Sequence, residues 1–227
     1  MALKGKKILI TAGPTWVALD NVRVISNAAS GETGVMLAGV LQKAGAKVTL
    51  CLGPCATVVK NRHVRVLPFR FFEELKKLLS VELKGNSYDA VVHSAAVSDF
   101  QPVKTAKGKI SSAKGFTVRL APTPKLIDLI KKDAPGAVLI GFKYEPAASP
   151  TALIEEGRKL LYKSDCDLVV ANTFRKDGYR AFLVSRQGLV PEICSKHELT
   201  GLLRMYLQAL GGGTKGSHCS CGCCGGK

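Results

Sequence analysis

The chain has 227 residues, 46% of them hydrophobic, and 33 Lys and Arg against 17 Asp and Glu give it a net charge of +16. No apolar run reaches the roughly 18 residues of a membrane span, and the N-terminal apolar run is too short for a signal peptide. We therefore expect a cytoplasmic protein without a membrane partner. The Lys and Arg residues are scattered rather than gathered into a stripe with aromatics, which favours a small anionic substrate over nucleic acid.

Short apolar runs alternate with helical patterns along the chain. Strands are expected at 7–11, 47–52, 89–94, 137–142 and 167–171, and helices at 33–44, 71–79, 124–132, 150–163 and 196–210. This alternation predicts an α/β fold with a mostly parallel sheet and helices on both of its faces. The later runs "RAFLVS" and "GLVPEI" predict an antiparallel hairpin.

The composition changes at Gly211, so we expect one domain over 1–210 and a disordered Gly/Cys-rich tail over 211–227. The tail contains Cys219, Cys221, Cys223 and Cys224 beside His218, which makes it a candidate for binding a soft metal ion. Its cysteines are too closely spaced for a two-pair zinc site. An unstructured tail with exposed thiols is the alternative.

Ligands of parallel α/β sheets bind beyond the carboxyl ends of the strands. After the first strand, Gly13 starts a long loop that contains Arg23 and Asn27 and ends in "SGETG" at a helix start. Such a helix start favours an anion, although a helix cap at Ser30 is the simpler interpretation. About twenty residues separate strand and helix, and the second strand does not end in an acidic residue, so the pattern differs from a dinucleotide fingerprint.

Three further segments follow expected strands. In "HSAAVSDF", Asp99 is a candidate to bind a base, a ribose or Mg²⁺, or to form an Asx turn. His93 is expected to be a packed strand residue rather than a catalyst. The lysine-rich "KTAKGKISSAKG" is a candidate triphosphate clamp or a solvated loop.

The turn "APTPKLI" is expected to start a helix at Pro124. Phe142, at a later strand end, could place its ring beside a base. Lys159 and Lys163 are four residues apart, so they share one helix face. That face either binds an anion or is a basic surface stripe.

In this order, "ITAGPT", "D-x-VR-x-ISN-x-x-SG", "SAAV-x-DF", "KI", "TPKLI", "IGF" and "DLVVAN" resemble phosphopantothenoylcysteine synthetase, the synthetase half of the bifunctional flavoprotein of coenzyme A biosynthesis. The resemblance extends from Lys6 to about Leu210. It implies a modified Rossmann-like sheet, usually in a homodimer. It also implies a ligase that joins 4′-phosphopantothenate to cysteine through an acyl-nucleotidylate, using CTP or ATP with Mg²⁺ and releasing pyrophosphate.

The same resemblance implies roles for individual residues. Asn27, which would polarise the acyl carbonyl, and Lys109 are implied to be catalytic. Substrate binding is implied for Arg23, Ser30, Gly31 and Gly34. Nucleotide binding is implied for Gly13, Ala95, Asp99, Lys109, Thr123, Pro124, Lys125, Leu126, Phe142, Lys159 and Lys163.

Some positions differ from the family pattern. Val17 stands where members often have Glu, and Glu32 and Ala29 stand where they often have Lys and Ser. Glu32 removes a positive charge near an expected phosphate site. Two other functions remain as alternatives, namely an NAD(P)-binding oxidoreductase and a non-catalytic protein that binds nucleotide or metal.

Overall fold

The computed structural model describes residues 3–111, 115–189 and 191–211. In chain order the elements are β1 (Lys7–Ala12), β2 (Trp16–Ala18), β3 (Val24–Ser26), α1 (Glu32–Lys43), β4 (Lys47–Leu52), β5 (Arg65–Pro68), α2 (Phe72–Gly85), β6 (Ala90–His93), β7 (Phe100–Pro102), β8 (Leu120–Pro122), α3 (Leu126–Asp133), β9 (Val138–Tyr144), α4 (Pro150–Lys163), β10 (Leu168–Arg175), β11 (Gly178–Ser185), β12 (Gly188–Leu189) and α5 (Lys196–Gly211).

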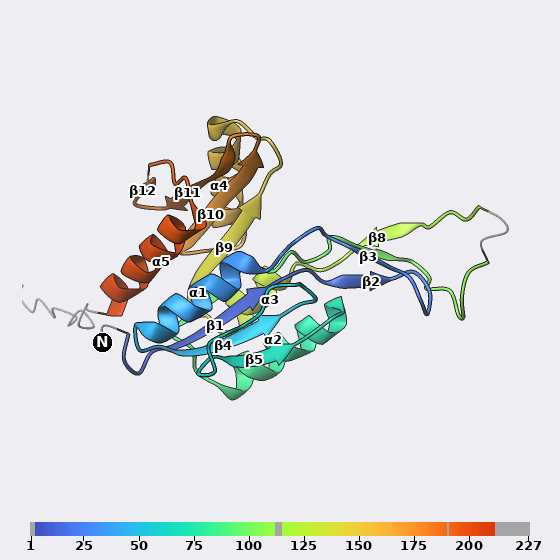
Figure 1. The fold of residues 1–227 in the computed structure, drawn as a ribbon, viewed down its shortest axis with the longest axis horizontal. Helices are drawn as coiled ribbons and strands as arrows, with labels where there is room; N and C mark the ends of the chain where they lie inside the picture. Colours follow the sequence, from blue (N-terminus) through green and yellow to red (C-terminus); the bar gives the residue numbers. More distant parts are fainter. Residues whose placement is uncertain (1–2, 112–114, 190, 212–227) are drawn as a thin grey trace, which may run out of the picture.

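Eight strands form the main sheet, in the order β12-β11-β10-β9-β6-β1-β4-β5 (Figure 1). The strands from β10 to β5 in this order run parallel, and β11 and β12 add an antiparallel hairpin at one edge. At the centre, Ile10 lies between Leu50 of β4 and Val92 of β6. The predicted mostly parallel sheet with a late antiparallel hairpin is therefore confirmed.

Helices cover both faces of this sheet. Successive strand residues point to opposite faces, so alternate residues of a strand pack against different helices. Ile8 and Ile10 of β1 pack in a core with α1 and α5. Leu9, between them, packs in a second core with α2, α3 and α4. Strands with both faces buried in this way explain the continuous apolar runs of the sequence.

A second feature, which we call the arm, projects from the sheet (Figure 1). It comprises the antiparallel pairs β2–β3 and β7–β8 with the loops that join each pair. Apolar side chains are exposed along it, including Val22 at 66% and Val103 at 61%. The arm was not predicted, because its strands have three residues each and show no clear periodicity.

The expected strands and helices are all present, with shifted ends. The helix predicted to start at Pro124 begins instead at Leu126. Thr123 stays outside the helix because its N–H donates to the Asp99 carbonyl at 2.9 Å, and because a residue before proline prefers an extended backbone. In the described part of the chain, no helix is long and apolar enough to cross a membrane. Of the predicted tail, Gly211 is the last residue of α5, and residues 212–227 lie outside the described residues.

Candidate functional site

The carboxyl ends of β1 and β6 meet at one edge of the sheet. The Ala96 N–H donates to the Gly13 carbonyl at 2.9 Å, and the Thr15 N–H donates to the Ala96 carbonyl at 3.3 Å. These bonds bring Gly13 and Ala95, both predicted to bind nucleotide, onto adjacent strand ends. The loops that follow are linked as well, since the Thr15 hydroxyl accepts from the Ser98 N–H at 2.9 Å.

Helix α1 starts directly beside Gly13. Its N-cap is Gly31, with a φ of 69° and no side-chain cap, so the predicted alternative of a cap at Ser30 is wrong. Ser30 Oγ instead accepts the Glu32 N–H at 3.3 Å. A Cβ at Gly31 would lie 3.3 Å from the Gly13 nitrogen, and one at Gly34 only 2.4 Å from the Ala12 Cβ. The glycines thus bring the positive end of α1 against the end of β1, a placement suited to an anion.

Asn27 follows β3 and reaches back to the loop after β6. Its side-chain amide donates to the Ala96 carbonyl at 3.0 Å and to the Val97 carbonyl at 3.3 Å. Asn27 thereby lies beside the loop that follows the end of β6. In this structure its N–H groups have backbone acceptors, so polarising an acyl carbonyl requires that one of them change partner.

The Asp99 loop and the "TPKLI" turn are brought together. The Lys125 ammonium donates to the Asp99 carboxylate at 2.6 Å, and the Thr123 hydroxyl donates to the Ser98 carbonyl at 2.7 Å. Asp99 is 61% exposed and faces a lysine rather than closing an Asx turn. Of two further residues predicted to bind nucleotide, Leu126 is buried in the core and Pro124 is exposed.

The basic face of α4 has an acidic partner that the sequence pattern did not indicate. Lys159 donates to Glu156 at 2.5 Å, and Lys143 of β9 lies 3.6 Å from the same carboxylate. The Lys159 ammonium lowers the pKa of Glu156. Lys163 is the exposed last residue of α4, and the Asp167 N–H that follows it donates to the Leu139 carbonyl near the amino end of β9, at 2.9 Å. Lys163 therefore lies at the opposite edge from the strand-end group, and its predicted place in the site is wrong. Phe142 is half-buried against the core that α1 and α5 cover, so only part of its ring is available to a base.

Arg23 and Lys109 lie on the arm, apart from the group at the strand ends. The three residues of β3 lie between Arg23 and Asn27, so the two are four positions apart, a span of roughly 13 Å in an extended strand. Arg23 Nη1 donates to the Asp20 carboxylate at 3.1 Å and to the Ile110 carbonyl at 3.0 Å. A single chain therefore does not place Lys109 and Asn27 together. Asp20 was not predicted, because its partner Ile110 lies 90 positions away.

Two residues that differ from the family pattern have local explanations. Val17 is 6% exposed and pairs with Ile25 in the arm, a position where a carboxylate would be buried. Glu32 forms an ion pair with Lys196 of α5. The negative charge at the start of α1 is therefore balanced from the neighbouring helix.

His93 is buried at the end of β6, as expected for a packed strand residue. Its Nδ1 lies 2.9 Å from the Thr11 hydroxyl. Burial lowers the pKa of His93 from 6.5 to about 4. The ring is therefore neutral at physiological pH, which agrees with a structural role.

Metal ligation has little support within residues 3–111, 115–189 and 191–211. No group of three or more His, Cys, Asp or Glu side chains in these ranges is arranged to hold a metal ion. Cys51 and Cys166 are buried, which raises the pKa of each thiol to about 12. The tail candidates Cys219, Cys221, Cys223 and Cys224 lie outside the described residues.

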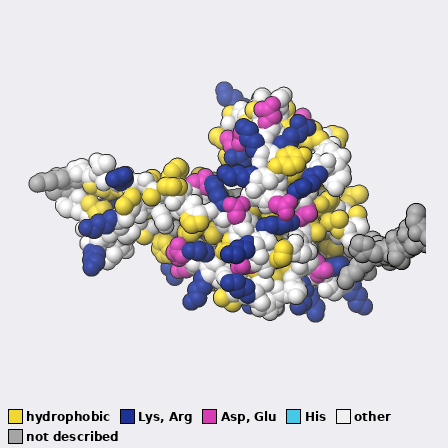
Figure 2. Space-filling model, turned by 180° about the vertical axis from the view of Figure 1, so that it is seen from behind, with side chains coloured by type: hydrophobic (Ala, Val, Ile, Leu, Met, Phe, Trp, Pro, Cys, Tyr) yellow, Lys and Arg dark blue, Asp and Glu magenta, His cyan; other side chains and the backbone are white. Residues whose placement is uncertain are grey.

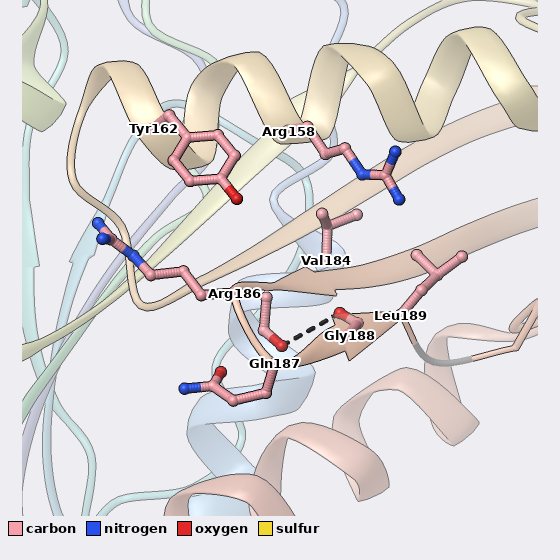
Figure 3. Close-up of a pocket in the computed structure, with 8 residues that line it drawn as sticks. Arg158, Tyr162, Val184, Arg186, Gln187, Gly188 and Leu189 are labelled. Atoms are coloured by element: carbon pink, nitrogen blue, oxygen red, sulfur yellow. Dashed lines mark hydrogen bonds between the residues drawn. The ribbon is translucent and has the colours of Figure 1, made fainter.

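A hollow of about 360 Å³ lies at the opposite edge of the sheet. Figure 3 shows Arg158 and Tyr162 of α4 facing the turn between β11 and β12 across it. Ser185, on its wall, pairs with Leu168 at the amino end of β10. The strand-end residues described above lie at the carboxyl edge, so this hollow is separate from the candidate site.

Comparison with known proteins identifies relatives. The family described as "DNA/pantothenate metabolism flavoprotein C-terminal domain" matches residues 3–196. Over 179 residues the chain is 41% identical to the coenzyme A biosynthesis bifunctional protein CoaBC of Thermococcus kodakarensis, covering 78% of this chain and 43% of that protein. The chain spans about half the length of the curated relatives it matches.

Solved structures of other proteins have a similar fold. The DNA/pantothenate metabolism flavoprotein of Streptococcus pneumoniae has a TM-score of 0.82 at 28% identity, covering 91% of this chain and all of that one. The C-terminal domain of a CoaBC protein has a TM-score of 0.76 at 25% identity, covering 92% and 97%. Together with the match over residues 3–196, these likenesses show that the chain belongs to the family of the DNA/pantothenate metabolism flavoprotein C-terminal domain.

Proposed function

We propose that this chain ligates 4′-phosphopantothenate to cysteine, in two steps through an acyl-nucleotidylate. The observation that carries the proposal is the start of α1 packed against Gly13, with the side chain of Asn27 bonded to the neighbouring loop after β6, in a chain that belongs to this family. The bifunctional CoaBC relatives, named for coenzyme A biosynthesis, support the substrate class.

In the first step a carboxylate oxygen of phosphopantothenate attacks the α-phosphate of the nucleotide. The new P–O bond forms as the bond to the β-phosphate bridging oxygen breaks, and pyrophosphate leaves with that electron pair. Two anions must approach, so positive charge is needed around the triphosphate. The N–H groups at the start of α1 would bind phosphate, and Lys109 and Lys159 would supply the charge.

Mg²⁺ fits this site mainly as a companion of the nucleotide. Mg²⁺ is usually bound by one or two carboxylates together with substrate phosphates, and here Asp99 is an exposed carboxylate in the loop after β6, paired with Lys125. We propose that Asp99 and the phosphates would hold the ion. When bound, Mg²⁺ would shield the charge of the triphosphate.

In the second step the cysteine amine attacks the acyl carbon. The C–N bond forms, the amine loses a proton, and the nucleoside monophosphate departs with the electrons of the acyl–oxygen bond. Negative charge develops on the acyl oxygen during this attack, and a donor aimed at it is typically worth roughly 10²–10³ in rate. Asn27 is the proposed donor, exchanging a carbonyl of the loop after β6 for the substrate oxygen.

The exposed apolar side chains of the arm support the proposal that the chain forms a homodimer. It exposes apolar side chains, including Val22, Phe100 and Val103, and Figure 2 shows hydrophobic side chains along this projection. Exposed apolar surface of this kind marks an interaction site. Arg23 and Lys109 lie on the same arm, away from Asn27, so a second copy would bring them to a neighbouring site. Sedimentation over micromolar concentrations would test this, and a monomer throughout would exclude it.

Pyrophosphate release tests the reaction directly. The purified protein with Mg²⁺ and phosphopantothenate would be given CTP or ATP in separate assays, with and without cysteine. We expect release with one nucleotide that depends on phosphopantothenate, and a ligated product that also requires cysteine. Absence of release with both nucleotides would exclude the proposal and direct attention to other ligands.

The alternatives make different predictions. An oxidoreductase that binds NAD(P) commonly has an acidic residue at the end of its second strand, whereas β4 ends at Leu52 and is followed by Gly53. A metal-binding function of the tail predicts that deleting residues 212–227 abolishes binding. The ligase predicts that the same deletion leaves pyrophosphate release unchanged.

A further inference from the structure

The turn of the β2–β3 hairpin, at residues 19–23, forms hydrogen bonds with three residues in the range 106–110 of the lysine-rich segment. The Ala106 N–H donates to the Leu19 carbonyl at 3.1 Å, and the Asn21 N–H donates to the Gly108 carbonyl at 3.3 Å. The Ile110 N–H donates to the Asp20 carboxylate at 3.0 Å. Alternate residues of the segment are therefore bonded to the hairpin.

Asp20 is the centre of this contact. Its Oδ1 accepts the N–H groups of Val22 and Arg23, both at 2.7 Å. Its Oδ2 accepts from Ile110 and from Arg23 Nη1. Because Arg23 Nη1 also donates to the Ile110 carbonyl at 3.0 Å, both backbone polar groups of Ile110 are bonded to the same pair. The peptide that follows Lys109 is thus held in one orientation.

Burial separates this carboxylate from any ligand. The Asp20 side chain is 0% exposed, while Lys107, Gly108 and Lys109 are exposed. The anchor points at Ala106 and Ile110 are partly buried on either side of them. Asp20 therefore acts on the lysines only through the backbone that carries them. The Ile110 N–H is the main reason that the pKa of Asp20 falls to about 2, so the carboxylate stays ionised at neutral pH.

We propose that Asp20, acting through Arg23 and the Ile110 backbone, is a positioning residue that fixes Lys109 on the arm for reaction with the triphosphate. This rests on the proposed function, in which Lys109 stabilises the charge of the phosphates. Asp20 itself contacts neither substrate nor nucleotide. Its removal should therefore reduce the contribution of Lys109 and leave the rest of the site in place.

A double-mutant cycle with the full chain tests the coupling. Asp20→Asn keeps the size of the side chain and removes its charge. We expect it to slow pyrophosphate release about tenfold, in line with the loss of charge-assisted hydrogen bonds. Combined with Lys109→Ala, it should add less than twofold to the loss caused by Lys109→Ala alone. Independent, multiplying effects of the two substitutions would overturn the proposal.

Asp89→Asn is the matched control. Asp89 also accepts a backbone N–H, from Lys7 at 2.8 Å, and pairs with Lys6 at 2.8 Å. It precedes β6, at the amino edge of the sheet. Its replacement should change stability without changing the rate of pyrophosphate release.

Proteolysis provides a readout that does not need the reaction. A protease specific for lysine should cut after Lys107 or Lys109 about tenfold faster in Asp20→Asn, since cleavage follows local opening. Unchanged cleavage would overturn the proposal while the ligase assignment stands. If the wild-type chain releases no pyrophosphate, the function fails, and cleavage still decides whether Asp20 holds the segment.

A second variant protects the test if Asp20→Asn does not fold. Ala106→Pro deletes the N–H that donates to the Leu19 carbonyl and leaves Asp20 and its partners unchanged in sequence. It should speed the same cleavage and slow the same Lys109-dependent step, by a smaller factor. A normal rate in Ala106→Pro, with cleavage accelerated, would show that the hold on the segment has no part in catalysis.

Discussion

Glu32 of α1 and Lys196 of α5 form an ion pair between the first turns of two helices on the same face of the sheet. Glu32 stands at the end of α1 where we propose that phosphate binds. Without a partner, its charge would repel that anion. The side chain of Lys196 is only 23% exposed, which keeps the neutralising charge close.

Lys196→Ala should therefore raise the KM for the nucleoside triphosphate. A charge near a helix end is worth roughly 0.3–1 kcal/mol, which corresponds to about a two- to fivefold change. Adding Glu32→Gln should restore the KM, because the uncompensated carboxylate is then gone. A KM that stays high in the double variant would mean that Lys196 acts on the nucleotide by itself.

Gly34→Ala should destabilise the fold. Its Cβ would lie 2.4 Å from the Ala12 Cβ and 3.0 Å from the Ser94 hydroxyl, so α1 would have to move away from β1. Overpacking of this kind costs roughly 1–3 kcal/mol. Urea unfolding monitored by circular dichroism measures the change.

Gly39→Ala is the matched control in the same helix, because a Cβ there meets nothing within 4 Å. This substitution should stabilise the protein by up to about 1 kcal/mol through helix propensity. Equal midpoints for the two alanine variants would contradict the close approach of α1 to β1.

Asn27→Ala should lower ligation by roughly 10²–10³-fold. The first step creates no charge on the acyl oxygen, so pyrophosphate should appear in a burst of about one equivalent while the ligated product does not. Rapid-quench analysis with labelled nucleotide separates the two steps. Asn86→Ala is the control, because that amide also donates to a carbonyl, of Glu82, at 3.3 Å. Loss of the burst itself would place Asn27 in the first step.

Stability should fall as the pH drops from 6.5 toward 4. The unfolded chain protonates His93 near pH 6.5, whereas the folded chain does so only near pH 4 because the ring is buried. The unfolded state therefore binds the extra proton in this window, which costs about 2 kcal/mol between pH 7 and pH 5. Urea unfolding of His93→Gln should lack this part of the slope. An unchanged slope would assign the effect to other groups.

The sheet was predictable because its strands are continuous apolar runs, such as "KKILITA" and "DLVV", separated by amphipathic helices. β5 was missed because it is a short edge strand, in which Arg65 turns outward to pair with Glu82 of α2. The arm was missed because its strands have three residues each, too few to show a periodicity in the sequence.

The candidate site was predictable where it depends on local sequence. Gly13, Gly31 and Gly34 have turns or close approaches that their neighbours in the chain already suggest. Contacts between distant segments were not predictable. Asp20 bonds to Ile110, and Lys159 shares Glu156 with Lys143 of β9, and only the folded chain brings these groups together.

The hydrogen bonds between the β2–β3 hairpin and the lysine-rich segment also bear on the order of folding. The pairing of β1 with β6 already joins residues 82 positions apart, and the contact of Asp20 with Ile110, which spans 90 positions, lies beyond the carboxyl ends of these two strands. Long loops are costly to close before other contacts hold their ends. We therefore expect a refolding chain to recover its helical circular dichroism signal first. Resistance to cleavage after Lys109 and pyrophosphate release should return later, when the contact of Asp20 with Ile110 forms.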